Sequence, residues 1–215
     1  MQNVFQQGVF SLGRHDTMND MQLEPSTLQA LGALSVVVGA CGYAFYIRGI
    51  IAGEVKPHAF SWTIWGILTA VAFFAQVSAG AGPGAWVTGF TALMSFGFVA
   101  VGLGVSSRRL ITPTDGVFFA AALAAIPLWY FSGNALWSVV LITVVDAVAF
   151  VPTFRKAYAD PRTESSMTYA LSGLKFVFGI VALSEITLTT ALYPASLVLM
   201  NGAFVVMVLL RRAKV

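Results

Sequence analysis

Residues 135–156, ALWSVVLITVVDAVAFVPTFRK, form an apolar stretch that ends on the basic pair Arg155-Lys156. A helix over positions 135–154 would be about 30 Å long at 1.5 Å per residue, which matches the hydrocarbon core of a bilayer. Asp146 lies near the middle of this stretch. The segment therefore predicts a membrane-spanning helix that carries one carboxylate deep in the membrane.

Six further apolar stretches of comparable length surround it. The chain has 215 residues, is 58% hydrophobic and has a mean hydropathy of +0.81, and a soluble core of this size cannot bury so much apolar surface. We therefore expect an all-α integral membrane protein with seven transmembrane helices. The predicted spans are Leu28–Ile51, Phe60–Ser78, Gly84–Val105, Gly116–Phe131, Ala135–Phe154, Met167–Ser184 and Thr190–Leu210.

The basic residues fall on alternate sides of these spans. Of the 12 Lys and Arg residues, Arg14 precedes the first span, Arg48 lies in the last turn of that span, Lys175 lies within the sixth, and the others lie in alternate loops and the C-terminal tail. Since cytoplasmic loops are enriched in Lys and Arg, this pattern predicts the N-terminus outside and the C-terminus inside. Basic residues spread over several loops do not predict nucleic-acid binding.

The chain contains a weak internal repeat. An offset of 107 residues aligns the first three predicted spans with the last three without a gap, and the fourth span has no counterpart. This predicts two parallel three-helix repeats joined by a linker helix. Residues 1–26 would form a polar, disordered tail, 27–112 the first repeat, 113–133 the linker and 134–215 the second repeat. The aligned pairs include Arg48 and Arg155, Gly66 and Gly173, Ala75 and Ala182, Trp62 and Tyr169, and Trp86 and Tyr193.

Two loops carry parts of a known family signature. Val151–Lys156 (VPTFRK) followed by Glu164–Met167 (ESSM) combines a Pro-polar pair, a basic pair and a Ser-rich start of the next helix. Lys56–Trp62 (KPHAFSW) keeps part of this pattern in the first half. From Leu28 to Arg212 the chain resembles the PQ-loop/SWEET superfamily of membrane transporters, which implies a carrier with a 3+1+3 arrangement of helices.

The family motif is incomplete in both halves. Thr153 stands where the family usually has Gln, and Phe45 occupies the first-half position equivalent to Pro152. The segments GPGAW at 82–86 and YPAS at 193–196 also resemble a group of uncharacterised bacterial membrane proteins, which implies a location in a bacterial cytoplasmic membrane.

Pro152 is expected to bend the fifth span near its inner end, because a proline removes one helical hydrogen bond and clashes with the preceding turn. The bend would serve either as the hinge of an inner gate or as a static kink, and the sequence favours neither. Trp62, near the start of the second span, is predicted to lie at the same gate.

Three polar side chains are predicted at one depth in the membrane. Asp146, Lys175 and Asn201 lie near the middle of the fifth, sixth and seventh spans. Ionisable groups in hydrocarbon are costly, and transporters built from repeats bind their substrates near the midplane. The alternative is that Asp146 and Lys175 form a buried ion pair joining two helices. Such a pair adds little stability, so we favour a substrate site.

The family resemblance bears on the same site. In SWEET transporters an Asn on the third helix of each triplet lines the sugar pocket, which implies this role for Asn201. Met94, beside Ser95, stands at the equivalent first-half position, so a zwitterionic or hydrogen-bonding solute fits as well as a sugar. Trp65 and Tyr169 would supply flat apolar walls.

Gln76, Glu185 and His58 lie near the predicted membrane boundaries. Water reaches polar side chains there and lowers the cost of placing them, so no direct role in the site is expected of these three.

These features predict a carrier that moves a small polar or zwitterionic solute by alternating access, either passively or with a proton. The alternative is a PQ-loop-type receptor or sorting protein that binds a small ligand without moving it. No enzyme is expected, since motifs such as His-Glu-x-x-His and Gly-x-Ser-x-Gly are missing. A retinal protein would carry its lysine on the last helix, where this chain has none. No cofactor or metal is predicted; the expected partners are the lipid bilayer and the solute, and a homo-oligomer stays open.

Overall fold

A computed structural model describes residues 23–53, 59–105, 113–162 and 165–214. The predictions for residues 1–22 and for His58 lie outside the described residues, as does the side chain of Pro152. The described part of the chain is all-helical. Its elements are α1 (Pro25–Ile51), α2 (Ala59–Ser78), the short 3₁₀ helix η2 (Gly82–Ala85), α3 (Trp86–Val105), α4 (Pro113–Ser132), α5 (Ala135–Ala159), α6 (Ser166–Val181) and α7 (Leu188–Arg212).

The helices follow the predicted spans with local differences at their ends. The predicted sixth span extended to Ser184, but α6 ends at Val181. The chain turns there because Ser184 donates its backbone N–H to the carbonyl oxygen of Ala81, 3.0 Å away, and so joins η2 instead of continuing the helix. At the other end of the chain α1 begins at Pro25, so the last residues assigned to the tail belong to a helix.

The outer surface of the helices is strongly apolar. Within the described residues, α1, α2, η2 with α3, α5 and α7 form five segments long and apolar enough to cross a membrane. The apolar stretches Gly116–Ser132 and Ser166–Val181 are shorter. Large hydrophobic side chains such as Leu103 and Leu199 are 70% and 72% exposed. Lipid tails, unlike water, solvate such a surface at no cost, so the fold is consistent with an integral membrane protein.

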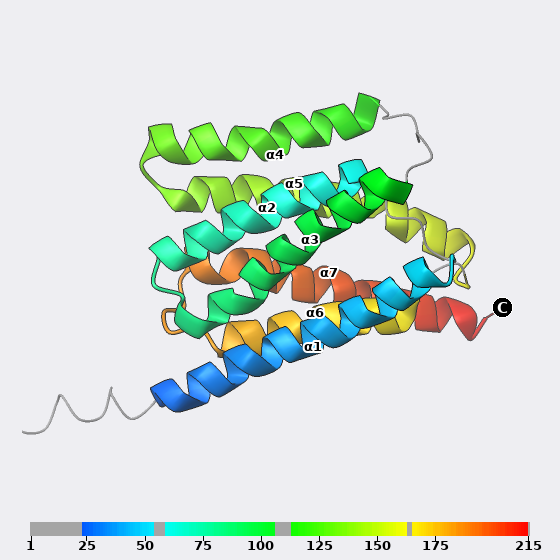
Figure 1. Cartoon of the computed structure of the whole chain (residues 1–215), viewed down its shortest axis with the longest axis horizontal. Coiled ribbons are helices and arrows are strands. Elements are labelled where there is room, and N and C mark those ends of the chain that lie inside the picture. The colour runs from blue at the N-terminus through cyan, green and yellow to red at the C-terminus, as the bar shows by residue number, and fades with distance from the viewer. Residues whose placement is uncertain (1–22, 54–58, 106–112, 163–164, 215) are drawn as a thin grey trace, which may run out of the picture.

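The helices form an elongated bundle in which successive helices run in opposite directions, as the colours of Figure 1 show. Helix α3 lies between α1 and α2, and α7 lies between α5 and α6. Helix α1 packs against α6, and α2 packs against α5. Helix α4 lies at one side of the bundle, where it contacts α5 and α2. Six helices therefore surround the middle of the bundle, and α4 covers it from one side.

The described arginines gather at one end of this bundle. Arg48 lies in the last turn of α1, and Arg211 and Arg212 lie in the last turn of α7. Helices α1, α5 and α7 all finish at this end, at the right of Figure 1, and we call it the basic end. Arg212 also donates to the carbonyl oxygen of Pro161 at 2.9 Å, which ties α7 to the connection between α5 and α6.

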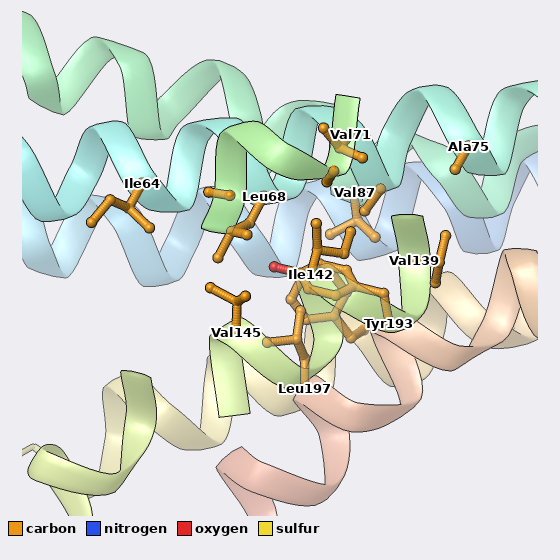
Figure 2. Packing of buried hydrophobic residues seen from close by; sticks show 14 residues of the cluster. Ile64, Leu68, Val71, Ala75, Val87, Val139, Ile142, Val145, Tyr193 and Leu197 are labelled. Carbon is orange, nitrogen blue, oxygen red and sulfur yellow. The ribbon is translucent and has the colours of Figure 1, made fainter. Parts of the chain in front are cut away.

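The main apolar core lies between α2, α5 and α7, with α4 packed onto it (Figure 2). Leu68 from α2 and Ile142 from α5 are completely buried in it. Tyr193 from α7 contributes its ring to this core and is 1% exposed. The core thus holds α5 and α7 against α2 and places the hydroxyl of Tyr193 in the interior.

Residues at the two ends of the bundle should be accessible from opposite sides of the membrane. With the single cysteine removed by Cys41→Ser, we compare Asn134→Cys, in the exposed turn before α5, with Lys214→Cys, exposed at the basic end. Because the basic end is expected to face the cytoplasm, an impermeant maleimide added to intact cells should label only the cysteine at 134. Labelling at 214 in intact cells, or equal labelling of both, would contradict this topology.

Candidate functional site

A cavity of about 290 Å³ lies inside the bundle. Its walls come from α1, α2, α3, α5, α6 and α7, and α4 contributes none of the lining residues. The lining residues of α1 begin at Val38, at the middle of the helix, and those of α2 end at Thr69, also near the middle of its helix. Since α1 ends and α2 begins at the basic end, the cavity extends from the middle of the bundle toward that end.

The structure brings together at this cavity all the predicted site and gate residues whose side chains it describes. Four of them are buried, while Trp65 is 37% exposed. The side chain of Pro152, which was predicted as a hinge, lies outside the described residues. The predicted residues that line the cavity are Trp62, Trp65, Ser95, Asp146, Tyr169, Lys175 and Asn201.

Lys175 reaches from α6 across the cavity to the opposite side of the bundle. Its ammonium group donates to the hydroxyl of Tyr43 on α1 at 3.2 Å and to that of Thr91 on α3 at 2.9 Å. The same nitrogen lies 4.6 Å from the ring centroid of Tyr43 and 4.9 Å from that of Phe176. Two neutral hydroxyls and two ring faces therefore surround this cation, which is 4% exposed.

Asp146 on α5 is also 4% exposed and has different partners. Its carboxylate accepts a hydrogen bond from the hydroxyl of Tyr193 on α7 at 3.2 Å and another from the side chain of Trp65 on α2. The alternative of a structural ion pair with Lys175 is wrong for this conformation: among the described residues neither charge pairs with the other. The two charges line one cavity and are held apart by separate partners.

Asn201 presents one free polar atom to the cavity. Its amide NH₂ donates to the carbonyl oxygen of Leu197, one turn earlier in α7, at 2.7 Å. The amide oxygen has no donor among the described residues, and Asn201 lines the cavity. The amide is thus fixed by its own helix with its acceptor available to a bound solute. Ser95 is likewise fixed, since its hydroxyl donates to the carbonyl oxygen of Thr91 at 2.8 Å.

Aromatic side chains form the walls toward the basic end. On one side Trp62 donates to the hydroxyl of Tyr46 at 3.1 Å and lies 5.1 Å from Trp65 between ring centroids. On the other side Tyr169 lies 4.0 Å from Phe204, measured in the same way. The cavity is thus polar in its middle and flanked by rings nearer the basic end, an arrangement typical of small-solute pockets.

The three hydroxyl residues that contact the two charges were not predicted, although helical spacing could have found them. Tyr43 lies one turn after Gly39, the first-half equivalent of Asp146, and Thr91 lies one turn before Ser95. Tyr193 lies two turns before Asn201 and faces the same way. Their aromatic and hydroxyl side chains are common in membrane helices, so no local signal distinguishes them from other residues of these types.

The expectation that Gln76 is hydrated at the membrane boundary is wrong. Gln76 is 1% exposed and donates to the backbone carbonyl of Thr190 on α7 at 2.8 Å. Its side-chain oxygen is buried and has no partner in the described part of the chain. Packing of α2 against α7, which hydropathy does not reveal, removes this side chain from water.

The end of the bundle opposite the basic end is closed by η2. A Cβ on Gly84 would lie 2.6 Å from the carbonyl oxygen of Gly179 on α6, and a Cβ on Gly32 of α1 would lie 2.8 Å from Pro83. Leu183 packs with the buried alanines of this turn. Close backbone contact, possible only with glycine, seals α1 and η2 against α6.

Comparison with known proteins adds no assignment, since the chain matches no family model, no curated protein and no solved structure.

Replacing Gly84 by Ala should loosen this closed end. The added methyl group would overlap the Gly179 carbonyl and Leu183, and overpacking of this kind costs about 1–3 kcal/mol. Gly97→Ala on α3 is the matched control, because a Cβ there meets nothing within 4 Å. We expect a lower Tm in detergent for Gly84→Ala only. Equal Tm values for the two variants would show that the contact at η2 is not tight.

Proposed function

We propose that this protein is a carrier in a bacterial cytoplasmic membrane, with α1–α3 and α5–α7 as parallel repeats, α4 as their linker and the basic end in the cytoplasm. A small polar or zwitterionic solute binds in the cavity between the repeats and crosses the membrane as the two rock against each other. The cavity with its two buried, unpaired charges is the observation that carries this proposal.

The proposed repeat is supported by the residues that line the cavity. Many of them occupy positions 107 residues apart, once on α1 or α2 and once on α5 or α6. The neighbours of each helix also correspond, since α1 packs on α6 as α5 packs on α2. A solute site on the axis between two repeats is what this correspondence favours. The lining pairs are Gly39 and Asp146, Tyr43 and Phe150, Tyr46 and Thr153, Trp62 and Tyr169, Trp65 and Ser172, and Thr69 and Phe176.

Three polar contacts of the cavity run between the two halves and therefore support a moving interface. Lys175 of the second half donates to Tyr43 and Thr91 of the first. Asp146 of the second half accepts from Trp65 of the first. Any rocking of one half against the other must break these bonds. A solute that supplies replacement partners would lower the cost of that step.

The direction in which the cavity opens follows from the difference between the two ends of the bundle. The η2 turn seals the end opposite the basic end, whereas the cavity extends toward the basic end. In the proposed cycle this conformation is closed to the outside, and the outward-facing state forms when η2 separates from α6.

The solute is found by a thermal-shift screen of purified protein against sugars, amino acids, nucleosides and vitamins, because a ligand of the native state raises the Tm. Uptake of the hit into proteoliposomes, with and without a pH gradient, then separates passive from proton-coupled transport. Saturable binding without flux would favour the receptor or sorting protein over the carrier.

Removing either buried charge should stop transport. Asp146→Asn and Lys175→Met should each reduce uptake of the identified solute to background while the protein remains folded and inserted, because both side chains contact the cavity. Asp160→Asn and Lys214→Met make the same chemical changes at exposed positions and should retain uptake. Wild-type flux in both cavity variants would refute the site.

A cross-link between the halves should also stop transport. A Cβ on Gly42 of α1 would lie 3.6 Å from the Cβ of Leu171 on α6, which suits a disulfide. In a Cys41→Ser background, the double variant Gly42→Cys/Leu171→Cys should lose uptake on oxidation and recover it on reduction. The two single-cysteine variants are the controls. Full uptake after complete cross-linking would exclude rocking at the α1–α6 contact.

A further inference from the structure

Among the described residues, each charge in the cavity lacks a counter-ion. Within the described part of the chain, the ammonium group of Lys175 has only neutral partners, the hydroxyls of Tyr43 and Thr91 and two ring faces. From the same described residues, the carboxylate of Asp146 has only the neutral donors Tyr193 and Trp65. Both side chains are 4% exposed. A buried charge without an opposite charge is costly, and more so in a membrane.

The two charges cannot relieve this cost by pairing in the described conformation, because the chain holds them on different partners. The stem of Lys175 passes α1 where Gly39 has no side chain, and a Cβ at Gly39 would lie 3.2 Å from the Cδ of Lys175. This opening directs the ammonium group toward Tyr43 and Thr91. Asp146 is directed instead toward Tyr193 and Trp65.

The missing counter-ions define the solute. A neutral sugar would leave both charges uncompensated, and an anion or a cation alone would compensate one of them. A molecule with one carboxylate and one amino group compensates both at once. The free amide oxygen of Asn201 is a further acceptor in the same cavity, suited to an ammonium group.

We propose that the cavity binds a zwitterion of the amino-acid class, with its carboxylate at Lys175 and the hydroxyl of Tyr43 and its ammonium group at Asp146. The aromatic walls formed by Trp62, Trp65 and Tyr169 contact the remaining atoms of the solute. This inference rests on the proposed function only in using the same cavity, and it requires binding but not flux.

The first experiment is a thermal-shift series on the wild-type protein in detergent. The probes are the protein α-amino acids, the ω-amino acids γ-aminobutyrate and ε-aminocaproate, and neutral sugars. At least one amino acid should raise the Tm, and neutral sugars should not. The amide and the N-acetyl form of that amino acid, which lose the negative and the positive charge respectively, should each bind at least tenfold more weakly.

The second experiment assigns each end of the zwitterion to its partner. The Lys175→Met variant should no longer bind the free amino acid more tightly than the amide, because it has no cation at the position where the carboxylate binds. Asp146→Asn should lose its preference for the free amino acid over the N-acetyl form. The exposed changes Lys214→Met and Asp160→Asn should keep both preferences.

The outcomes separate this inference from the proposed carrier. Equal affinity of the wild-type protein for the amino acid, its amide and its N-acetyl form would overturn the zwitterion site, and this comparison needs no variant to fold. Binding and flux of a neutral sugar with no response to any amino acid would overturn it while leaving the carrier intact. Selective binding of an amino acid without flux would support the zwitterion site and refute the carrier.

Discussion

The cost of placing a charge in hydrocarbon governs the arrangement of this protein. The described arginines lie at the basic end, where α1, α5 and α7 finish, and in a membrane this end would meet water and lipid headgroups. Lys175 and Asp146 are the exceptions, and both line the central cavity. Packing in the rest of the bundle positions hydroxyls and an indole around these two charges, so that the interior tolerates them without pairing them.

The hydrogen bonds of the two charges give the site its asymmetry. Gly39 and Asp146, which are equivalent in the proposed repeat, both line the cavity, yet one leaves space and the other supplies a carboxylate. The stem of Lys175 passes through the space that Gly39 leaves and reaches the opposite half. In the proposed repeat, two equivalent halves thus carry an electrically polar cavity, which suits a solute with two different ends better than a solute with uniform hydroxyls.

Much of this could be predicted from local sequence. Hydropathy found the helices within a few residues, because a membrane requires long apolar helices whose backbone is hydrogen-bonded internally. Depth along a helix placed Asp146, Lys175 and Asn201 near one level, and all three line the cavity. The end of α6 at Val181 was missed, since the contact between Ser184 and Ala81 joins residues far apart in the chain.

The sequence by itself determined the class of fold, the level of the polar groups and the end that carries the basic residues, because all of these follow from the cost of transferring side chains one by one into lipid. Only the tertiary structure decided which groups meet. Hydropathy could not show that Tyr43 and Thr91 accept hydrogen bonds from Lys175. Nor could it show that Tyr193 donates to Asp146 or that Gln76 is buried. Those pairings depend on the rotation of each helix and on close contacts at glycines, which arise from packing between helices distant in sequence.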